Sequence, residues 1–161
     1  MLNGTQVVRE TIYNSSLNRY IAKDIRYFYD AEGRPTAIRH YMLDSTGTVT
    51  GDTVYYLGTN LQGDVIAIYD STGTKIYTYE YDAWGNLIRG CQLATGGSAA
   101  NSVNQFRYRG YYYDIETGLY YLQSRYYNPQ WGRFLNADGQ LNHTLTGYNL
   151  FAYCVNNPVM F

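Results

Sequence analysis

The sequence predicts an all-β fold, a meander of about seven β-hairpins with a short helix near the C-terminus. Three observations support this prediction: an excess of tyrosine, a recurring turn unit and side chains that alternate with a period of two. The chain has 21 tyrosines, and tyrosine suits strands because its ring packs on a pleated surface while its hydroxyl tolerates water. Sixteen glycines and only 3 prolines fit a chain with many tight turns.

The turn unit is an aromatic or apolar residue, an aspartate, two variable residues and a glycine. The aspartate side chain accepts hydrogen bonds from backbone N–H groups in the turn, and the glycine takes the left-handed conformation that closes a short hairpin loop. The expected tips lie near Gly33, Gly47, Gly63, Gly73, Gly85, Gly118 and Gly132. The expected turn aspartates are Asp30, Asp70, Asp82 and Asp114. Calcium binding or paired catalytic carboxylates are the alternative for these aspartates.

The segments between the turns alternate as strands do. Residues 76–81 place Ile76, Thr78 and Glu80 on one face and three tyrosines on the other. The connection over about residues 92–104 is different, because residues 94–102 are mostly small. We expect an exposed, mobile loop there.

The last segment loses the period of two. Leu150, Tyr153 and Cys154 have helical spacing, and Pro158 disfavours a helical conformation at the residue before it. The sequence therefore predicts a short helix from about residue 148 to residue 155.

A meander of this kind has open ends. A single hairpin is marginal alone, and stacked hairpins bury a shared face while the two terminal strands keep unpaired backbone groups. We therefore expect self-association, or pairing with a missing partner, through the edge strands.

Composition limits the other functions. With 12 basic and 13 acidic residues the net charge is −1, which provides no field to attract nucleic acid or an anionic membrane. No apolar run approaches the length of a membrane span, and residues 1–4 do not begin a signal peptide. We find no motif for a cofactor or a metal ion.

Several segments resemble a known family, the RHS or YD-repeat proteins. Residues 58–65 and 81–86 resemble YD repeats, and residues 106–121, 125–129, 132–134 and 147–158 resemble the RHS repeat-associated core. The resemblance covers roughly residues 20 to 161. It implies YD-repeat hairpins over residues 1–105 and a core segment over residues 106–161, within one continuous β structure.

The family includes bacterial polymorphic toxins, toxin-complex cocoon proteins and teneurins. The resemblance implies that the hairpins form part of a spiralling sheet or shell, whose core segment plugs one end. The expected function is that of a structural shell fragment that encapsulates or presents a C-terminal effector. The expected partners are the remainder of the shell and that effector, in a secreted or cell-surface bacterial protein.

An autoproteolytic core is the alternative from the enzyme class. Many family members cut themselves after an Asp-Pro-x-Gly-Leu-like motif, and core aspartates and an arginine are implicated. By position Asp138 and Arg133 are the candidates here. A turn aspartate and a surface or paired arginine is the simpler interpretation, since Gly139 follows where many relatives have proline and the chain to Phe161 lacks the motif. We expect cleavage only in a longer chain.

A carbohydrate-binding or adhesion module is the third alternative. Tyrosine ladders could stack on sugars, although cross-strand packing explains them more simply. The ladders are Tyr77, Tyr79 and Tyr81; Tyr111 and Tyr113; and Tyr120 and Tyr126.

The histidines and cysteines carry no motif. His40 and His143 have no metal-ligand spacing or nucleophilic partner, so we expect structural or solvent roles. Cys91 and Cys154 are expected to be free thiols, and one disulfide is the alternative.

Overall fold

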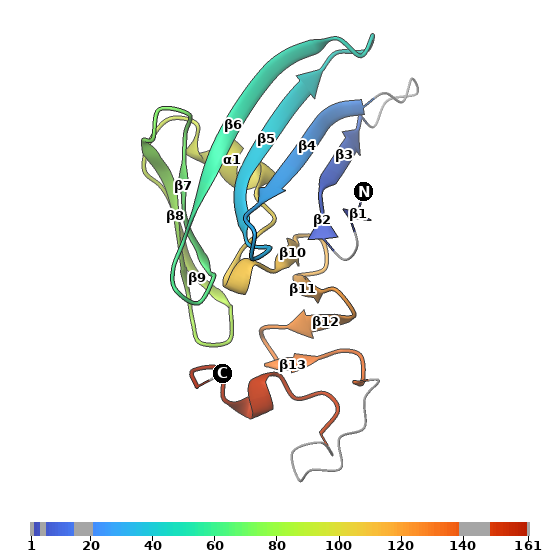
Figure 1. Cartoon of the computed structure of the whole chain (residues 1–161), viewed down its shortest axis with the longest axis vertical. Helices are drawn as coiled ribbons and strands as arrows, with labels where there is room; N and C mark the ends of the chain where they lie inside the picture. Colours follow the sequence, from blue (N-terminus) through green and yellow to red (C-terminus); the bar gives the residue numbers. More distant parts are fainter. Residues whose placement is uncertain (1, 4–5, 15–20, 139–148, 161) are drawn as a thin grey trace.

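The computed structural model describes residues 2–3, 6–14, 21–138 and 149–160, and it confirms the all-β fold (Figure 1). Antiparallel strands form almost all of its regular structure. The strands are β1 Leu2–Asn3, β2 Gln6–Val7, β3 Arg9–Tyr13, β4 Ile21–Tyr29, β5 Pro35–Leu43, β6 Val49–Thr59, β7 Val65–Tyr69, β8 Lys75–Tyr81, β9 Leu87–Gln92, β10 Tyr112–Asp114, β11 Leu119–Leu122, β12 Arg125–Asn128 and β13 Arg133–Phe134.

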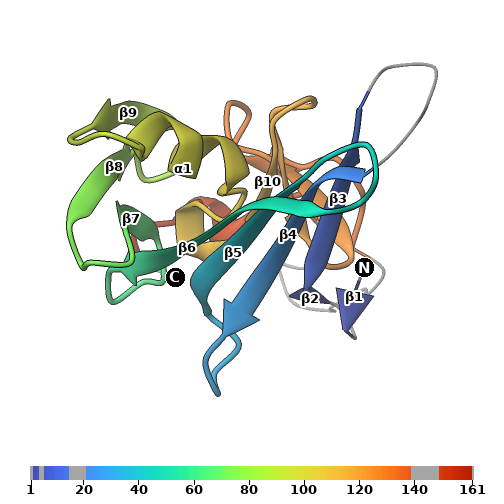
Figure 2. The ribbon, with the colours of Figure 1, turned by 90° about the horizontal axis from the view of Figure 1, so that it is seen from above.

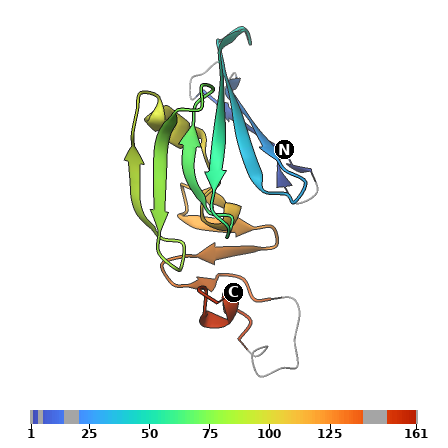
Figure 3. The ribbon, with the colours of Figure 1, turned by 60° about the vertical axis from the view of Figure 1, so that its left-hand side comes forward.

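Strands β3 to β9 form a seven-stranded sheet in sequence order, which we call the large sheet. Strands β10 to β13 form a second meander, the small sheet, and β1 pairs with β2. Seen from above, the large sheet curves around α1 and β10 (Figure 2). The strands of the small sheet run crosswise below it (Figure 3).

All seven expected hairpin tips are present. Their glycines have φ between 63° and 89°, in the left-handed region that favours glycine. In one example Asp70 Oδ1 accepts the N–H groups of Thr72 and Thr74, both at 2.9 Å. The geometry of the turn is therefore a local property of its aspartate and glycine.

The core of the large sheet mixes aliphatic and tyrosine side chains. Ile25, Ile38 and Ile68 are fully buried on it, and Tyr27 and Tyr55 are almost so. One face of the sheet is covered by the segment that follows β9 and by the start of the small sheet.

The prediction of a mobile loop over residues 92–104 is wrong for the central part of this segment. Helix α1, Gly97–Val103, packs on β7 and β8, and Ala100 and Val103 are fully buried. A Cβ on Gly97 would lie 2.3 Å from the Ile76 carbonyl oxygen, so glycine lets the helix begin against the strand. The small residues of this segment, which suggested a loop, instead allow the helix to pack closely against the sheet.

The helix expected over residues 148–155 is corrected to a single 3-10 turn, Cys154–Asn156. Its three residues have φ of 46°, 51° and 60°, which L-residues adopt only at a cost. The residues just before it pair with β13, since Phe134 N–H donates to Phe151 O at 2.9 Å. This pairing excludes a regular helix, and residue 148 lies outside the described residues.

Candidate functional site: the junction between the two sheets

The small sheet and the segment just before it bind one hairpin tip of the large sheet through three tyrosine hydroxyls. Each hydroxyl donates to a backbone carbonyl in the turn between β8 and β9. The pairs are Tyr108 with Ala83 at 2.7 Å, Tyr127 with Trp84 at 2.7 Å and Tyr120 with Gly85 at 2.8 Å. We call this contact the tyrosine junction.

Two turn glycines make room for the junction. A Cβ on Gly85 would lie 2.6 Å from the Tyr108 ring, and a Cβ on Gly132 would lie 2.8 Å from the Trp84 ring. Both glycines also have positive φ. They are therefore required by packing as well as by the turn conformation.

The turn itself is held rigid by its own polar residues. Asp82 Oδ1 accepts the N–H groups of Trp84 and Asn86 at 2.8 and 2.9 Å. The Asn86 amide donates both to Asp82 Oδ2 at 2.8 Å and to Pro129 O at 3.1 Å, which ties the turn to the small sheet. The three carbonyls thus face the tyrosines in a fixed arrangement.

Burial keeps the junction tyrosines protonated. It raises the pKa of Tyr120 and Tyr127 well above the usual value of 10.0. Burial also raises the pKa of Tyr108, and the Arg109 charge opposes this. An ordinary tyrosine is already protonated at physiological pH, so burial extends the donor form of these phenols into alkaline solution.

A second contact starts at the turn between β6 and β7. Asn60 donates to Asp64 Oδ2 at 2.6 Å, and the Arg109 N–H donates to Asp64 Oδ1 at 2.8 Å. The Arg109 guanidinium then donates to Pro158 O at 2.7 Å and to Cys154 Sγ at 3.7 Å. One arginine thereby links a YD-type turn to the C-terminal segment.

A third contact joins β3, β4 and β10. Glu10 Oε2 accepts the hydroxyls of Tyr27 at 2.9 Å and Tyr112 at 3.1 Å. Together the three contacts fix the small sheet and its preceding segment against the large sheet.

The candidate cleavage residues lie at the far end of the small sheet. Asp138 Oδ2 pairs with Arg125 Nη1 at 2.9 Å, and the Arg125 guanidinium lies 3.6 Å from the centre of the Phe134 ring. The Asp138 side chain is 40% exposed, and Arg133 is exposed on β13. The sequence did not indicate Arg125 as the partner of Asp138.

Most of the tyrosine ladder packs in the interior. Tyr79 and Tyr120 are 2% and 1% exposed, and Tyr81 packs against both hydrophobic clusters, whereas Tyr126 is 42% exposed. These rings chiefly fill the core. The sequence indicated the rings but not their acceptors, because a backbone carbonyl has no sequence signature.

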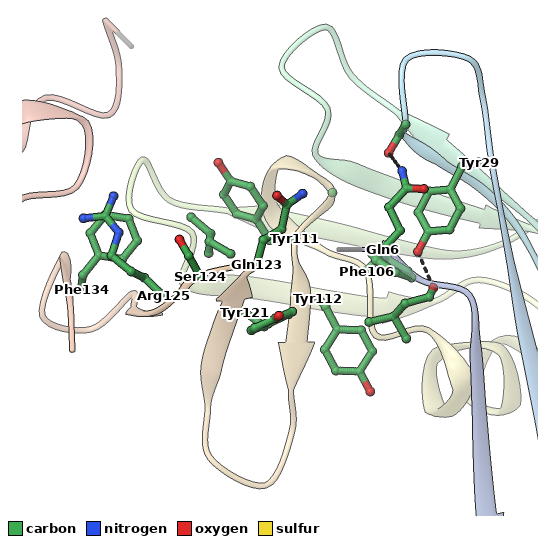
Figure 4. Close-up of a pocket in the computed structure, with 14 residues that line it drawn as sticks. Gln6, Tyr29, Phe106, Tyr111, Tyr112, Tyr121, Gln123, Ser124, Arg125 and Phe134 are labelled. Carbon is green, nitrogen blue, oxygen red and sulfur yellow. Dashed lines mark hydrogen bonds between the residues drawn. The ribbon is translucent and has the colours of Figure 1, made fainter. Parts of the chain in front are cut away.

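A cleft of about 350 Å³ opens where β2 and the turn after β4 face the small sheet (Figure 4). Tyr29, Tyr111 and Tyr121 line it, with the amides of Gln6 and Gln123. Its lining residues include no carboxylate, histidine or cysteine. The cleft can offer hydrogen bonds and ring surfaces, but its lining has no nucleophile–base pair.

The remaining candidate groups are dispersed. His40 is buried, and burial together with the Lys23 charge lowers its pKa. His143 lies outside the described residues. Cys91 and Cys154 are free thiols. Within the described parts of the chain, no group of three or more His, Cys, Asp or Glu residues could hold a metal ion, and no helix is long and apolar enough to cross a membrane.

Comparisons with known proteins agree with this architecture. The tRNA3(Ser)-specific nuclease WapA of Bacillus spizizenii is 37% identical over 161 residues, covering 95% of this chain and 7% of that protein. The tRNA nuclease WapA of Bacillus subtilis is 40% identical over 157 residues, covering 86% and 6%. Toxin subunit YenC1 of Yersinia entomophaga is 36% identical over 121 residues, covering 75% and 12%. The chain thus spans only a small part of these relatives.

A solved structure shows the same fold. The crystal structure of TcdB2-TccC3 matches 96% of this chain and 8% of its own chain, with a TM-score of 0.63 and 24% identity. The family model for the teneurin YD-shell matches residues 41–159. This chain is therefore a structural shell fragment of the RHS or YD-repeat type, and it belongs to the teneurin YD-shell family.

Proposed function

We propose that this chain is a wall segment of a larger shell that encloses or presents a C-terminal effector, in a secreted or surface-delivered bacterial protein. The observation that supports this best is the tyrosine junction, which turns the chain from one sheet into a second sheet running crosswise. A hollow shell must be closed at its end, and a sheet whose strands keep one direction leaves that end open. A second sheet that runs crosswise can close it. Relatives named as toxins and nucleases supply the second support.

Protease protection tests this proposal. The protein is the longest natural polypeptide that contains this segment, and the readout is the rate at which protease digests its C-terminal part. We expect protection in the unmodified protein and its loss when Tyr108, Tyr120 and Tyr127 are all changed to Phe. Tyr56→Phe, on a half-exposed ring, is the matched control. Digestion of the unmodified protein at the rate of the isolated effector would contradict the proposal.

The edges of the large sheet supply the expected partner surfaces. Strands β3 and β9 are its terminal strands, and Leu87 and Ile88 on β9 are 41% and 67% exposed. We propose that these edges pair with the remainder of the shell or with a second copy. Sizing of the 161-residue chain should show association that increases with concentration. A strict monomer at high concentration would be evidence against open pairing edges.

Self-cleavage is the second candidate function. Its support is the Arg125–Asp138 pair, which holds a carboxylate at 2.9 Å from a guanidinium just after β13. We propose that the Asp138 carboxylate, ion-paired with Arg125, attacks the scissile peptide carbonyl when the downstream motif is present. The peptide C–N bond breaks, the amine leaves with a proton from water, and a second water hydrolyses the anhydride. In a longer chain that cleaves, Asp138→Asn should abolish cleavage, and Arg125→Gln should slow it. Cleavage that continues in the Asp138→Asn variant would remove Asp138 from this role.

A further inference from the structure

We propose that one face of the small sheet, together with two clefts beside it, forms a groove that binds a neutral glycan, a chain of β-linked pyranose units. The face is defined by Tyr112, Tyr121 and Tyr126, and we call these three residues the outer ladder. This inference goes beyond the wall function and does not depend on it, because binding is measured on this chain with a soluble oligosaccharide.

The outer ladder is a row of tyrosines on three neighbouring strands. Tyr121 on β11 lies directly opposite Tyr112 on β10 and Tyr126 on β12, so the three side chains share one face. The ring centres of Tyr121 and Tyr126 are 5.5 Å apart, and Tyr126 is 42% exposed. The adjacent residues Tyr120 and Tyr127 belong to the tyrosine junction instead. The outer ladder is therefore a set of rings that the junction does not use.

Two clefts meet at the outer ladder. The first is the cleft of about 350 Å³ shown in Figure 4, and the second, of about 520 Å³, lies between β3 and the small sheet. Val7, Tyr112 and Tyr121 line both of them, and Glu10 and Tyr126 line the second. Both volumes lie in the range of about 300–1,000 Å³ that is usual for small-molecule sites. The shared residues join the two clefts into one groove, as a chain-like ligand requires.

The rings of the first cleft are held in place before a ligand arrives. The Tyr112 hydroxyl donates to Glu10 Oε2 at 3.1 Å, and the Tyr29 hydroxyl donates to Val7 O. The Phe106 ring lies edge-on to both tyrosines, with its centre 5.8 Å from that of Tyr29 and 5.7 Å from that of Tyr112. A rigid wall of this kind loses little conformational entropy on binding.

Two side-chain amides line the same cleft (Figure 4). Gln6 Nε2 donates to Gly33 O at a long 3.4 Å, and Gln6 Oε1 has no donor among the described residues. The exposed Gln123 side chain forms no hydrogen bond within the described part of the chain. Each amide offers one acceptor oxygen and N–H donors, and neighbouring sugar hydroxyls both donate and accept.

The backbone at Gln123 supports a role for its side chain. This residue has φ of 60° in the turn between β11 and β12, a conformation that L-residues adopt only at a cost. Two-residue hairpin turns ordinarily place glycine or asparagine at such a position. Glutamine there keeps a long amide at the edge of the cleft at the expense of stability, and strain of this kind is typical of functional positions.

The charges of the groove favour a neutral ligand. Arg125 is the one charged residue that lines the first cleft, and it pairs with Asp138 at 2.9 Å. The charged residues that line the second cleft are Arg9, Glu10 and Asp114. Of these, Arg9 pairs with Asp24 at 2.9 Å. An anionic ligand would meet the two carboxylates, and a cationic ligand would find no carboxylate in the first cleft.

A pyranose with equatorial hydroxyls matches the remaining features. Its two flat faces present C–H groups that pack on tyrosine rings, and its hydroxyls point outward from the ring edge toward the amides and carboxylates of the groove. A β-linked chain of such units is extended, so consecutive units can lie along the outer ladder. A purely apolar ligand would leave the Gln6 and Gln123 amides without hydrogen bonds.

The test is a titration of the 161-residue chain with cellotetraose, followed by NMR on the Tyr121 and Tyr126 ring signals and the Gln123 side-chain amide. Maltotetraose is the matched control, since it has the same composition and a bent, α-linked chain, and N-acetyl-Gly-Gln-Gly-amide is the peptide control. We expect saturable shifts with a Kd of about 1 mM for cellotetraose and affinities at least about fivefold weaker for both controls.

Three results would contradict the proposal. The absence of saturable shifts with cellotetraose would overturn the binding site. Equal affinity for maltotetraose would overturn the assignment to an extended β-linked chain. Equal affinity for the peptide would overturn the assignment to a glycan.

Two variants separate binding from architecture. Gln123→Gly should weaken cellotetraose binding about fivefold and raise thermal stability, because glycine adopts the positive φ without strain. Tyr126→Leu should weaken binding about tenfold, because the exposed ring is lost. Tyr56→Leu, at a ring on β6 that is 50% exposed, is the control and should leave binding unchanged. Unchanged binding in both test variants would overturn the proposal, and a loss of stability in Gln123→Gly would mean that this amide serves the fold.

Discussion

The large and the small sheet are both antiparallel meanders, yet their interiors are stabilised differently. The core of the large sheet includes fully buried Ile25, Ile38 and Ile68, which need no polar partner. The cluster of the small sheet is aromatic and consists of Tyr108, Tyr120, Tyr127, Phe134 and Tyr153. Three of its tyrosines find their acceptors in a turn of the large sheet. The comparison teaches that the small sheet depends on the large one for hydrogen bonds that it cannot supply itself.

The largest expected effect is a loss of the small sheet at alkaline pH. Burial raises the pKa of Tyr120, Tyr127 and Tyr153, in the cluster of the small sheet, well above the usual value of 10.0. Since the unfolded chain releases these protons first, their contribution is fully present below pH 10 and is lost as the pH rises above it. Hydrogen exchange from neutral pH to pH 12 should show the small sheet opening before β5, whose fully buried core side chain is Ile38. Simultaneous opening would refute the difference between the two sheets.

The next effect concerns the glycine under the junction. Gly85→Ala should lower the free energy of unfolding by about 3 kcal/mol, because it adds a clash with the Tyr108 ring to the cost of a positive φ. Gly73→Ala is the matched control, since its φ is +82° and nothing lies within 4 Å of the added Cβ. It should cost about 1 kcal/mol. Equal losses in urea unfolding would mean that the junction adds nothing to the turn.

A smaller effect is expected from one hydroxyl. Tyr127→Phe removes a 2.7 Å hydrogen bond and leaves the Trp84 carbonyl without it, so unfolding should become easier by about 1–2 kcal/mol. Tyr56→Phe, on a ring that is 50% exposed, should change the free energy by less than about 0.5 kcal/mol. If the two variants match in denaturant unfolding, the hydroxyl of Tyr127 does not hold the two sheets together.

The smallest effect lies at acid pH and belongs to the large sheet. The pKa values of Asp44 and Asp70 are lowered chiefly by hydrogen bonds from Thr46 and Thr72. Their contribution is present above the usual value of 3.8 and is lost as the pH falls below it. Asp70→Asn keeps an acceptor oxygen without the titration, so its stability should fall less steeply with acid than that of the unmodified chain. If the free energy of unfolding of the two proteins fell equally with acid, Asp70 would make no contribution to the pH dependence of stability.

The features that could be predicted from the sequence are those that depend on residues close together in the chain. Each hairpin tip follows from an aspartate or asparagine and a glycine a few residues apart, so the meander could be read without knowing its neighbours. Helix α1 could not be predicted in this way. Gly97 is needed because the Ile76 backbone lies close to it, and Ala100 is buried where the helix packs on β7 and β8, so both depend on tertiary contacts. The C-terminal helix was wrong for the same reason, since pairing with β13 decides that segment.

The candidate site was predictable only in part. The tyrosines were evident as a pattern, but their acceptors are main-chain oxygens, which have no sequence signature. The partners of Asp64 and Asp138 are Arg109 and Arg125, and only the path of the folded chain brings these residues together. The outer ladder could not be assembled, because the register of the strands decides which tyrosines share a face.

The tyrosine junction also limits how this segment can vary. Its donors recognise only carbonyl oxygens, so the side chain at position 83 can be exchanged freely, whereas one inserted residue would displace every acceptor at once. Natural variants of this turn should therefore differ at position 83 and agree in length.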